Sequence, residues 1–229
     1  TGMVEIEPGL LKGADEGFLA IDDIDLMEIR SSLEVLESAI EGRVILETEG
    51  LSSKYETNTS VIATTSISPR SLNAHLADRF DICVRMTRPE EEERAKSMLR
   101  QVTIDGNTLD RGLFDKMDSE IASRIDKARI ILPTVKLLKR HRDSIARICV
   151  EYRVEGYRGA ISCAETAVAL AALEGRRKTS DSDIESAVIM CLNHRRNVFD
   201  ITKKPAYDKP KLWGESDIKR FIHDNRHLN

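Results

Sequence analysis

Two adjacent carboxylates follow a short apolar run near the start of the chain, and together they could bind a metal ion. The run Phe18-Leu19-Ala20-Ile21 ends in Asp22-Asp23, a pattern typical of a strand that is buried on both faces. At such a strand end in nucleotide hydrolases, the first acid holds Mg²⁺ and the second polarises the attacking water. The same residues equally describe a strand that enters a polar turn, so both interpretations stay open at this point.

A second polar strand end and a single arginine lie further along the chain. Ser60 to Thr65 is another buried-strand candidate, and its last residues are polar. Arg79 follows a short amphipathic helix predicted around Leu72 to Leu76. An arginine held in this way could reach the γ-phosphate bound by a neighbouring subunit and stabilise the transferring group. The alternative is a surface arginine paired with Asp78 or Asp81.

The elements that must position these residues alternate between strands and helices. Apolar residues from Leu26 to Ile40 recur at helical spacing, and Gly42 supplies a helix stop. Val44 to Glu56 is predicted to form a β-hairpin with its turn near Gly50. Ile82-Cys83-Val84 is a third buried-strand candidate. Strands that alternate with helices predict a parallel α/β sheet, or part of one.

The hydrophobic period becomes helical after Arg88. Pro89 suits a first helical turn and precedes four acids, Glu90 to Glu93. Further helices are predicted at Leu113 to Ala128, Val135 to Val150, Ala164 to Leu173, and after the capping box Ser180 to Asp183. We therefore expect three parts: α/β over residues 1–88, an α-helical bundle over 89–197, and an irregular C-terminal arm over 198–229.

Composition excludes several classes of protein. The 229 residues are 41% hydrophobic and 32% charged, with a formal net charge of -4, which argues against a disordered tail or a chain that mainly coats nucleic acid. No apolar run approaches the roughly 20 residues that cross a bilayer, and no signal region opens the chain. The four cysteines lack metal-ligand spacing, as expected for reduced thiols of a cytoplasmic protein.

Two weaker features could bind ligands. His223 and His227 are four residues apart and could share a helix face as metal ligands, although ordinary surface is the commoner outcome. The cluster Lys139-Arg140-His141-Arg142 could touch nucleic acid, but a solvated helix face is the favoured interpretation.

Several motifs, taken in order, resemble one family. The first part contains Pro8-Gly9-Leu10-Leu11, Gly17 to Asp25, Glu41-Gly42-Arg43-Val44 and Ala77-Asp78-Arg79-Phe80. The helical part contains Leu132-Pro133, Gly156-x-Arg158-Gly159, Ala169 to Arg176 and His194-Arg195-Arg196. These motifs are similar to the second half of an AAA+ ATPase module, with the closest likeness to the I subunit of magnesium chelatase. The likeness covers roughly Val4 to Arg196.

The resemblance implies a fold, a set of site residues and a set of partners. The fold would be a partial AAA+ core of the P-loop type followed by an α-helical lid. Asp22 would bind Mg²⁺, Asp23 would orient the attacking water, and Arg79 would act across a subunit boundary. Ser66, in the sensor-1 strand end, and Arg158, in the lid, would face the nucleotide. The implied cofactors are ATP and Mg²⁺, and the implied partners are neighbouring AAA+ subunits in a ring and chelatase partner subunits.

Departures from the family pattern leave more than one function open. The 229 residues contain no Gly-Lys dipeptide, so we expect no P-loop among them, and the resemblance places that loop upstream of Val4. Asp23 stands where the family commonly has Glu, Ser66 where it commonly has an amide, and Glu165 where it has a sensor-2 arginine. The chain is then either a chelatase-like ATPase subunit that drives metal insertion into a tetrapyrrole, or a nucleotide-incompetent scaffold or regulatory module. A DNA-helicase relative is a third option, which the weak basicity disfavours.

Overall fold

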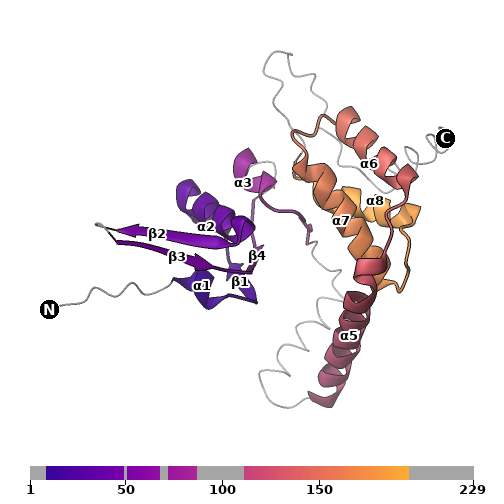
Figure 1. Ribbon diagram of the computed structural model, residues 1–229, viewed down its shortest axis with the longest axis horizontal. Coiled ribbons are helices and arrows are strands. Elements are labelled where there is room, and N and C mark those ends of the chain that lie inside the picture. The colour runs from indigo at the N-terminus through magenta and orange to yellow at the C-terminus, as the bar shows by residue number, and fades with distance from the viewer. Residues whose placement is uncertain (1–8, 49–50, 68–71, 87–110, 196–229) are drawn as a thin grey trace. The chain divides into compact units, whose positions relative to one another are not determined.

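The computed structural model describes residues 9–48, 51–67, 72–86 and 111–195, and the chain divides after Asp81 into two compact units (Figure 1). The predicted helix after Pro89, the pair His223 and His227, and the arm over 198–229 lie outside the described residues. None of the described helices combines the length and apolar character needed to cross a bilayer.

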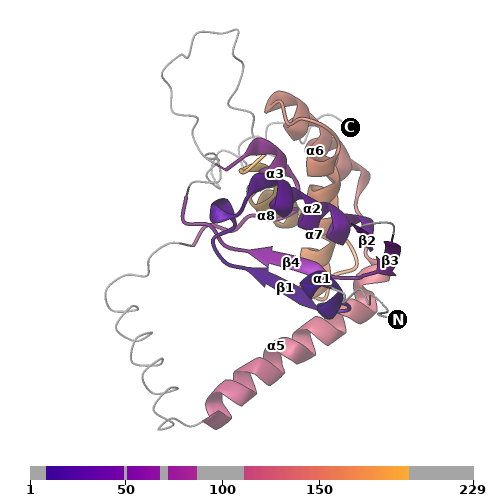
Figure 2. The same cartoon turned by 90° about the vertical axis from the view of Figure 1, so that its left-hand side faces the viewer.

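The first unit is built on a pair of parallel strands. After helix α1 (Leu10–Gly13), strand β1 (Phe18–Ile21) pairs with β4 (Ser60–Ala63), and Figure 2 shows the two side by side. The register runs from Phe18 opposite Ser60 to Ile21 opposite Ala63. The predicted parallel pairing is therefore confirmed, and both strands end at the same edge.

One face of this strand pair carries the core of the first unit. Ile21 and Val61 pack against a buried cluster of Ile24, Leu36 and Leu76. The opposite face is open, since Phe18 is 71% exposed and Ile62 is 55% exposed. The prediction of strands buried on both faces is thus wrong for the described residues, because the elements that pack on the pair cover only one face.

Helix α2 (Ile29–Glu41) follows the 3-10 turn η1 (Ile24–Leu26) and leads into the hairpin of β2 (Arg43–Thr48) and β3 (Leu51–Glu56). Gly42 ends α2 with a φ of 67°, and a Cβ there would lie 3.3 Å from the Thr57 carbonyl oxygen. Both the helix stop and the hairpin were expected and are confirmed. Helix α3 (Ala74–Asp78) begins slightly later than predicted, because the Asn73 side chain caps it.

The second unit is a bundle of α5 (Arg111–Ile131), α6 (Lys139–Glu151), α7 (Arg158–Leu173) and α8 (Asp181–Leu192), with the 3-10 turn η2 (Leu132–Thr134) after α5. Small residues allow α7 and α8 to approach closely. The buried contacts come from Cys163, Ala167, Ala187, Val188 and Cys191. The capping box predicted at the start of α8 is present, with Ser180 and Asp183 bonded reciprocally.

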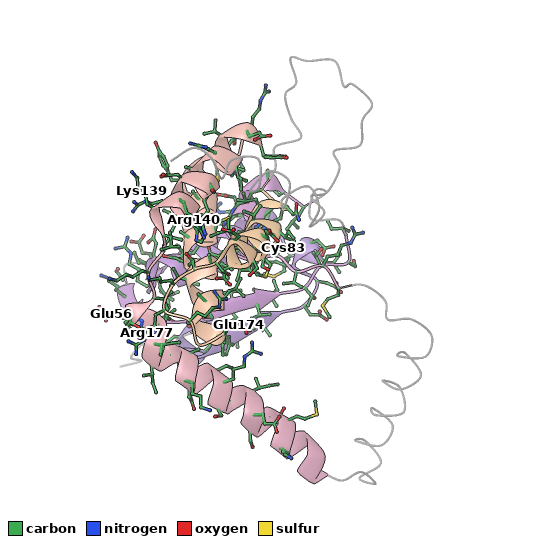
Figure 3. All side chains as sticks on the ribbon, turned by 90° about the vertical axis from the view of Figure 1, so that its right-hand side faces the viewer. Glu56, Cys83, Lys139, Arg140, Glu174 and Arg177 are labelled. Atoms are coloured by element: carbon green, nitrogen blue, oxygen red, sulfur yellow. The ribbon has the colours of Figure 1, made fainter. Side chains whose placement is uncertain are left out.

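Two expectations for helices and one for a strand are corrected. Helix α6 begins at Lys139 and not at Val135, because the backbone of Lys136 instead accepts from Thr179 N–H at 3.2 Å. Helix α7 begins at Arg158, earlier than the expected start at Ala164. The strand predicted at Ile82 to Val84 is not formed, because the Cys83 N–H (Cys83 is labelled in Figure 3) donates to the Met190 carbonyl of α8 at 2.9 Å.

A buried histidine corrects the interpretation of the basic cluster on α6. His141 is 2% exposed, with Nδ1 2.6 Å from Thr179 Oγ1 and Nε2 2.9 Å from Asp181 Oδ1. Arg140, labelled in Figure 3, lies 3.5 Å from the same Asp181 carboxylate. The cluster is therefore partly an anchor between α6 and the start of α8, and only partly a solvated face.

A second polar anchor lies at the same end of α8. Asp183 is buried, and it accepts two hydrogen bonds from Arg176, at 2.6 and 2.7 Å. The Ser180 N–H donates to the same carboxylate at 2.7 Å. Burial alone would raise the pKa of Asp183, but the bonds from Arg176 and Ser180 outweigh it and hold the pKa below its ordinary value of 3.8. The carboxylate therefore stays ionised inside the second unit.

Candidate functional site

The polar residues that follow β1 and β4 meet at one edge of the strand pair. Ile21 lies opposite Ala63, so Asp22 and Thr64 are the next residues on each strand. The Thr64 hydroxyl donates to Asp22 Oδ1. Ligands of open α/β sheets bind beyond the carboxyl ends of parallel strands, and Asp22 lies at this edge.

Asp23 is held in an uncommon backbone conformation beside Asp22. Its φ and ψ are 47° and 56°, in the left-handed region that Asp tolerates better than most residues. The Asp23 N–H donates to Thr64 Oγ1 at 3.0 Å. The two predicted acids therefore lie in a turn, and hydrogen bonds to the side chain of Thr64, the residue after β4, hold this turn in place.

A third acid belongs to the same edge. Thr65 Oγ1 donates to Asp25 Oδ1 at 2.6 Å and accepts from the Ile67 N–H at 3.3 Å. Ser66, the residue implied to face the nucleotide, lies between them in an exposed bend. Thr64 and Thr65, the two residues before Ser66, are the residues that contact the acids. In the sequence, only the polar end of the predicted strand indicated a role for these threonines.

Arg79 lies at the end of α3 in the same unit and pairs with an acid of α2. Its Nη2 donates to Glu37 Oε1, and its side chain is 25% exposed. Its Nε is buried and has no hydrogen-bond partner among the described residues. The structure therefore anchors this arginine through Glu37, a partner that the sequence did not indicate.

The lid residues expected near a nucleotide lie on α7 of the second unit. Arg158 is the first residue of α7 and is half-buried, whereas Glu165 is exposed two turns later. Gly159 has a packing role, because a Cβ there would lie 3.0 Å from both Leu192 Cδ2 and Val154 Cγ1. The motif around Arg158 therefore includes a glycine that packs closely against its neighbours in the bundle.

A polar depression of about 580 Å³ lies elsewhere in the first unit, at the base of the hairpin. Some of the charges that line it are paired: Lys12 Nζ bonds Asp15 and also the Glu56 main-chain carbonyl, and Arg43 bonds Glu41. The hydrogen bond from Lys12, with another from the Asn58 N–H, lowers the pKa of Asp15. These contacts fix the hairpin base, and Asp22 and Asp23 do not line the depression.

The donor atoms at the strand edge suit Mg²⁺ only in part. Carboxylate and hydroxyl oxygens are the hard ligands that Mg²⁺ prefers. Among the residues that the structure describes, no group of three or more His, Cys, Asp or Glu could hold a metal ion. Mg²⁺ in nucleotide sites typically takes one or two carboxylates and completes its shell with phosphates and water. A single strand-end acid is thus compatible with a metal that arrives with a nucleotide.

Comparisons with known proteins show which family this chain resembles. An AAA lid domain family matches residues 142–212. The magnesium-chelatase subunit ChlI of Nephroselmis olivacea is 32% identical over 196 residues, which are 85% of this chain and 55% of that protein. The chloroplastic ChlI subunit of Nicotiana tabacum is also 32% identical, over 85% of this chain and 46% of that protein. The chain therefore spans about half the length of these curated relatives.

Similarity to a solved structure provides evidence about the fold and not about the function. A candidate ATPase from Cytophaga hutchinsonii superposes with a TM-score of 0.58 at 17% identity, covering 90% of this chain and 64% of that one. A parallel strand pair followed by a helical lid, together with these matches, defines an AAA+ fold. Within that class, the chain belongs to the magnesium-chelatase I-subunit family and corresponds to the C-terminal part of its members.

Proposed function

We propose that this chain is the C-terminal part of a chelatase-type AAA+ motor subunit, which couples ATP hydrolysis to insertion of a metal ion into a tetrapyrrole. The observation that carries the proposal is the strand edge where Thr64 holds the adjacent acids Asp22 and Asp23. The relatives named as magnesium-chelatase subunits support the chelatase assignment. The subunit would work in a ring with AAA+ neighbours and with chelatase partner subunits.

Asp22 is the residue proposed to hold Mg²⁺ at this edge. It is exposed at the end of β1, and Thr64 contacts only its Oδ1. A bound Mg²⁺ would neutralise the charge of the β- and γ-phosphates of ATP. The loop that grips those phosphates would come from a segment outside these 229 residues.

Asp23 and Arg79 complete the proposed machinery. Asp23 would orient the attacking water, and its side chain is one methylene shorter than a glutamate at that position. Arg79 would extend its guanidinium to the phosphate bound by an adjacent subunit, where a fixed positive charge stabilises the transferring group. Its side chain is 25% exposed, so part of the guanidinium reaches the surface of the unit.

A second candidate function is a scaffold or regulatory module that binds no nucleotide. The exposed carboxylate of Glu165 on α7 favours it, because a negative charge at a phosphate-facing lid position would repel the nucleotide. Ser66 favours it as well, since its hydroxyl replaces the amide common in the family.

ATP hydrolysis by the assembled protein separates the two functions. The proposal predicts Mg²⁺-dependent hydrolysis that falls by at least about 100-fold in Asp22→Asn, since a fixed charge at the reacting phosphates is lost. The matched control is Asp126→Asn, an exposed acid on α5, which should leave the rate unchanged. An assembly that neither binds nor hydrolyses ATP would contradict the proposed motor function. The scaffold or regulatory function would then be the remaining candidate.

A further inference from the structure

Thr64 makes four hydrogen bonds to four consecutive residues, from the last residue of β1 to the first residue of η1. Its N–H donates to the Ile21 carbonyl at 2.9 Å, and its carbonyl accepts from the Ile24 N–H at 3.0 Å. Between these, its hydroxyl donates to Asp22 Oδ1 and accepts from the Asp23 N–H at 3.0 Å. The residue that follows β4 therefore bonds every residue from Ile21 to Ile24, the segment that carries both acids.

The two main-chain bonds and the two hydroxyl bonds serve different purposes. The Thr64 N–H bond follows the last ladder pair, Ile21 and Ala63, and the bond from the Ile24 N–H closes the turn beyond it; any residue except proline at position 64 could make both. The hydroxyl bonds need a group that is both a donor and an acceptor, which Thr and Ser provide and Val does not. Only the side chain is therefore specific to the acids.

Both hydroxyl bonds constrain the proposed reacting groups. The bond to Oδ1 limits rotation of the Asp22 carboxylate about its side chain. The bond from the Asp23 N–H stabilises a backbone with a φ of 47°, which a non-glycine residue adopts at a cost. Without the hydroxyl, the Asp23 side chain would point in a different direction whenever the turn relaxed.

We propose that Thr64 is the positioning residue of this site: it orients the Asp22 carboxylate and holds the Asp23 backbone in its left-handed conformation. This inference rests on the proposed function, because it gives Thr64 a role in ATP hydrolysis. Thr64 touches the acids and acts through them. It differs from Ser66, the strand-end residue that the family pattern indicates.

The kinetic test compares Thr64→Val with Thr64→Ser in the assembled ATPase. Loss of groups that orient metal-binding and catalytic residues typically lowers activity by about 10- to 100-fold, and we expect that loss in kcat for Thr64→Val. The KM for ATP should change by less than about twofold, because the acids remain present. Thr64→Ser keeps the hydroxyl and should restore kcat to within about threefold.

Control and structural readouts make the test decisive. Thr134→Val removes an exposed hydroxyl that bonds only the Ile131 carbonyl, at 2.7 Å, and should leave kcat unchanged. In this chain alone, Thr64→Val should speed hydrogen exchange of the Asp23 amide at least about tenfold, while the Ile24 amide keeps its protection.

The outcomes separate the two proposals. Wild-type kcat in Thr64→Val, a Thr64→Ser variant as slow as Thr64→Val, or unchanged exchange at Asp23 would each overturn the positioning role. A wild-type assembly that hydrolyses no ATP would instead overturn the proposed function, and the exchange rate of the Asp23 amide would then decide whether Thr64 holds the turn.

Discussion

Arg79 and Glu37 form an ion pair between the end of α3 and helix α2, in which Arg79 Nη2 donates to Glu37 Oε1. The glutamate side chain is 48% exposed, so the pair lies at the surface of the first unit. The arginine side chain is 25% exposed, and the hydrogen bond to Glu37 holds it at Nη2.

Removal of this arginine should affect activity far more than stability. Surface ion pairs contribute about 0–1 kcal/mol, so Arg79→Ala should lower the free energy of unfolding by no more than about 1 kcal/mol. An arginine that contacts the transferring phosphate contributes about 10³-fold or more to kcat, and the ATPase rate should fall accordingly. Urea unfolding and steady-state ATPase assays measure the two effects.

Arg30→Ala is the matched control for Arg79. Arg30 bonds Glu34 at 3.0 Å, and both residues lie on α2, the helix that also carries Glu37. Both side chains are well exposed. This variant should change neither the unfolding free energy nor the ATPase rate. Equal losses of activity in the two variants would show that Arg79 has no special role.

The ion pair of Arg176 and Asp183 predicts a pH dependence of lid stability. The folded-state pKa of Asp183 lies below its ordinary value of 3.8, so its contribution is complete above that value and is lost as pH falls through the folded-state pKa. Arg176→Gln should reduce the unfolding free energy by about 1–3 kcal/mol at neutral pH. The difference from wild type should shrink as the pH drops below 3.8.

Urea titrations across this pH range measure the effect. Arg30→Gln, which disrupts an exposed pair, should shift the unfolding free energy by less than about 0.5 kcal/mol at every pH. A penalty for Arg176→Gln that stays constant down to the lowest pH at which the protein folds would contradict the assigned role of the Asp183 carboxylate.

Gly159 should be sensitive to a single added methyl group. Its Cβ would lie 3.0 Å from Leu192 Cδ2, a side chain that is 2% exposed and cannot move into solvent. Overpacking of this kind typically costs about 1–3 kcal/mol, which exceeds the gain of up to about 1 kcal/mol from replacing a helical glycine. Gly159→Ala should therefore lower the midpoint of urea unfolding.

Gly13→Ala provides the comparison for Gly159. Gly13 ends α1, and a Cβ there would meet no atom within 4 Å. We expect this substitution to leave stability unchanged or slightly higher. A Gly159→Ala protein as stable as the wild type would mean that Leu192 and Val154 repack without cost.

Local patterns were predictable from the sequence, and the structure confirms them. The strand before Asp22, the stop at Gly42, the hairpin and the capping box at Ser180 depend on residues close in sequence, whose turn and cap preferences are strong. The family motifs also predicted the order of these elements along the chain. Thus the elements that carry the two acids could be expected before any coordinates.

Contacts between distant residues were not predictable in the same way. The role of Thr64 depends on a register that places it beside Asp22. The apolar segment at Ile82 to Val84 has strand-like residues, yet the backbone of its central residue, Cys83, bonds a helix carbonyl. Exposure of Phe18 follows from which elements cover the sheet, and a strand's own sequence does not contain that information.

Mixing two inactive variants tests the central proposal, that the acids of one subunit work with the arginine of the next, most directly. An Arg79→Ala subunit keeps Asp22 and Asp23, whereas an Asp22→Asn subunit keeps Arg79. If Arg79 acts across the subunit boundary, each variant alone should hydrolyse almost no ATP, and rings that contain both should regain activity at interfaces where intact acids meet an intact arginine. Mixed rings that assemble but stay as inactive as either variant, or an Arg79→Ala ring that keeps the wild-type rate, would contradict the account.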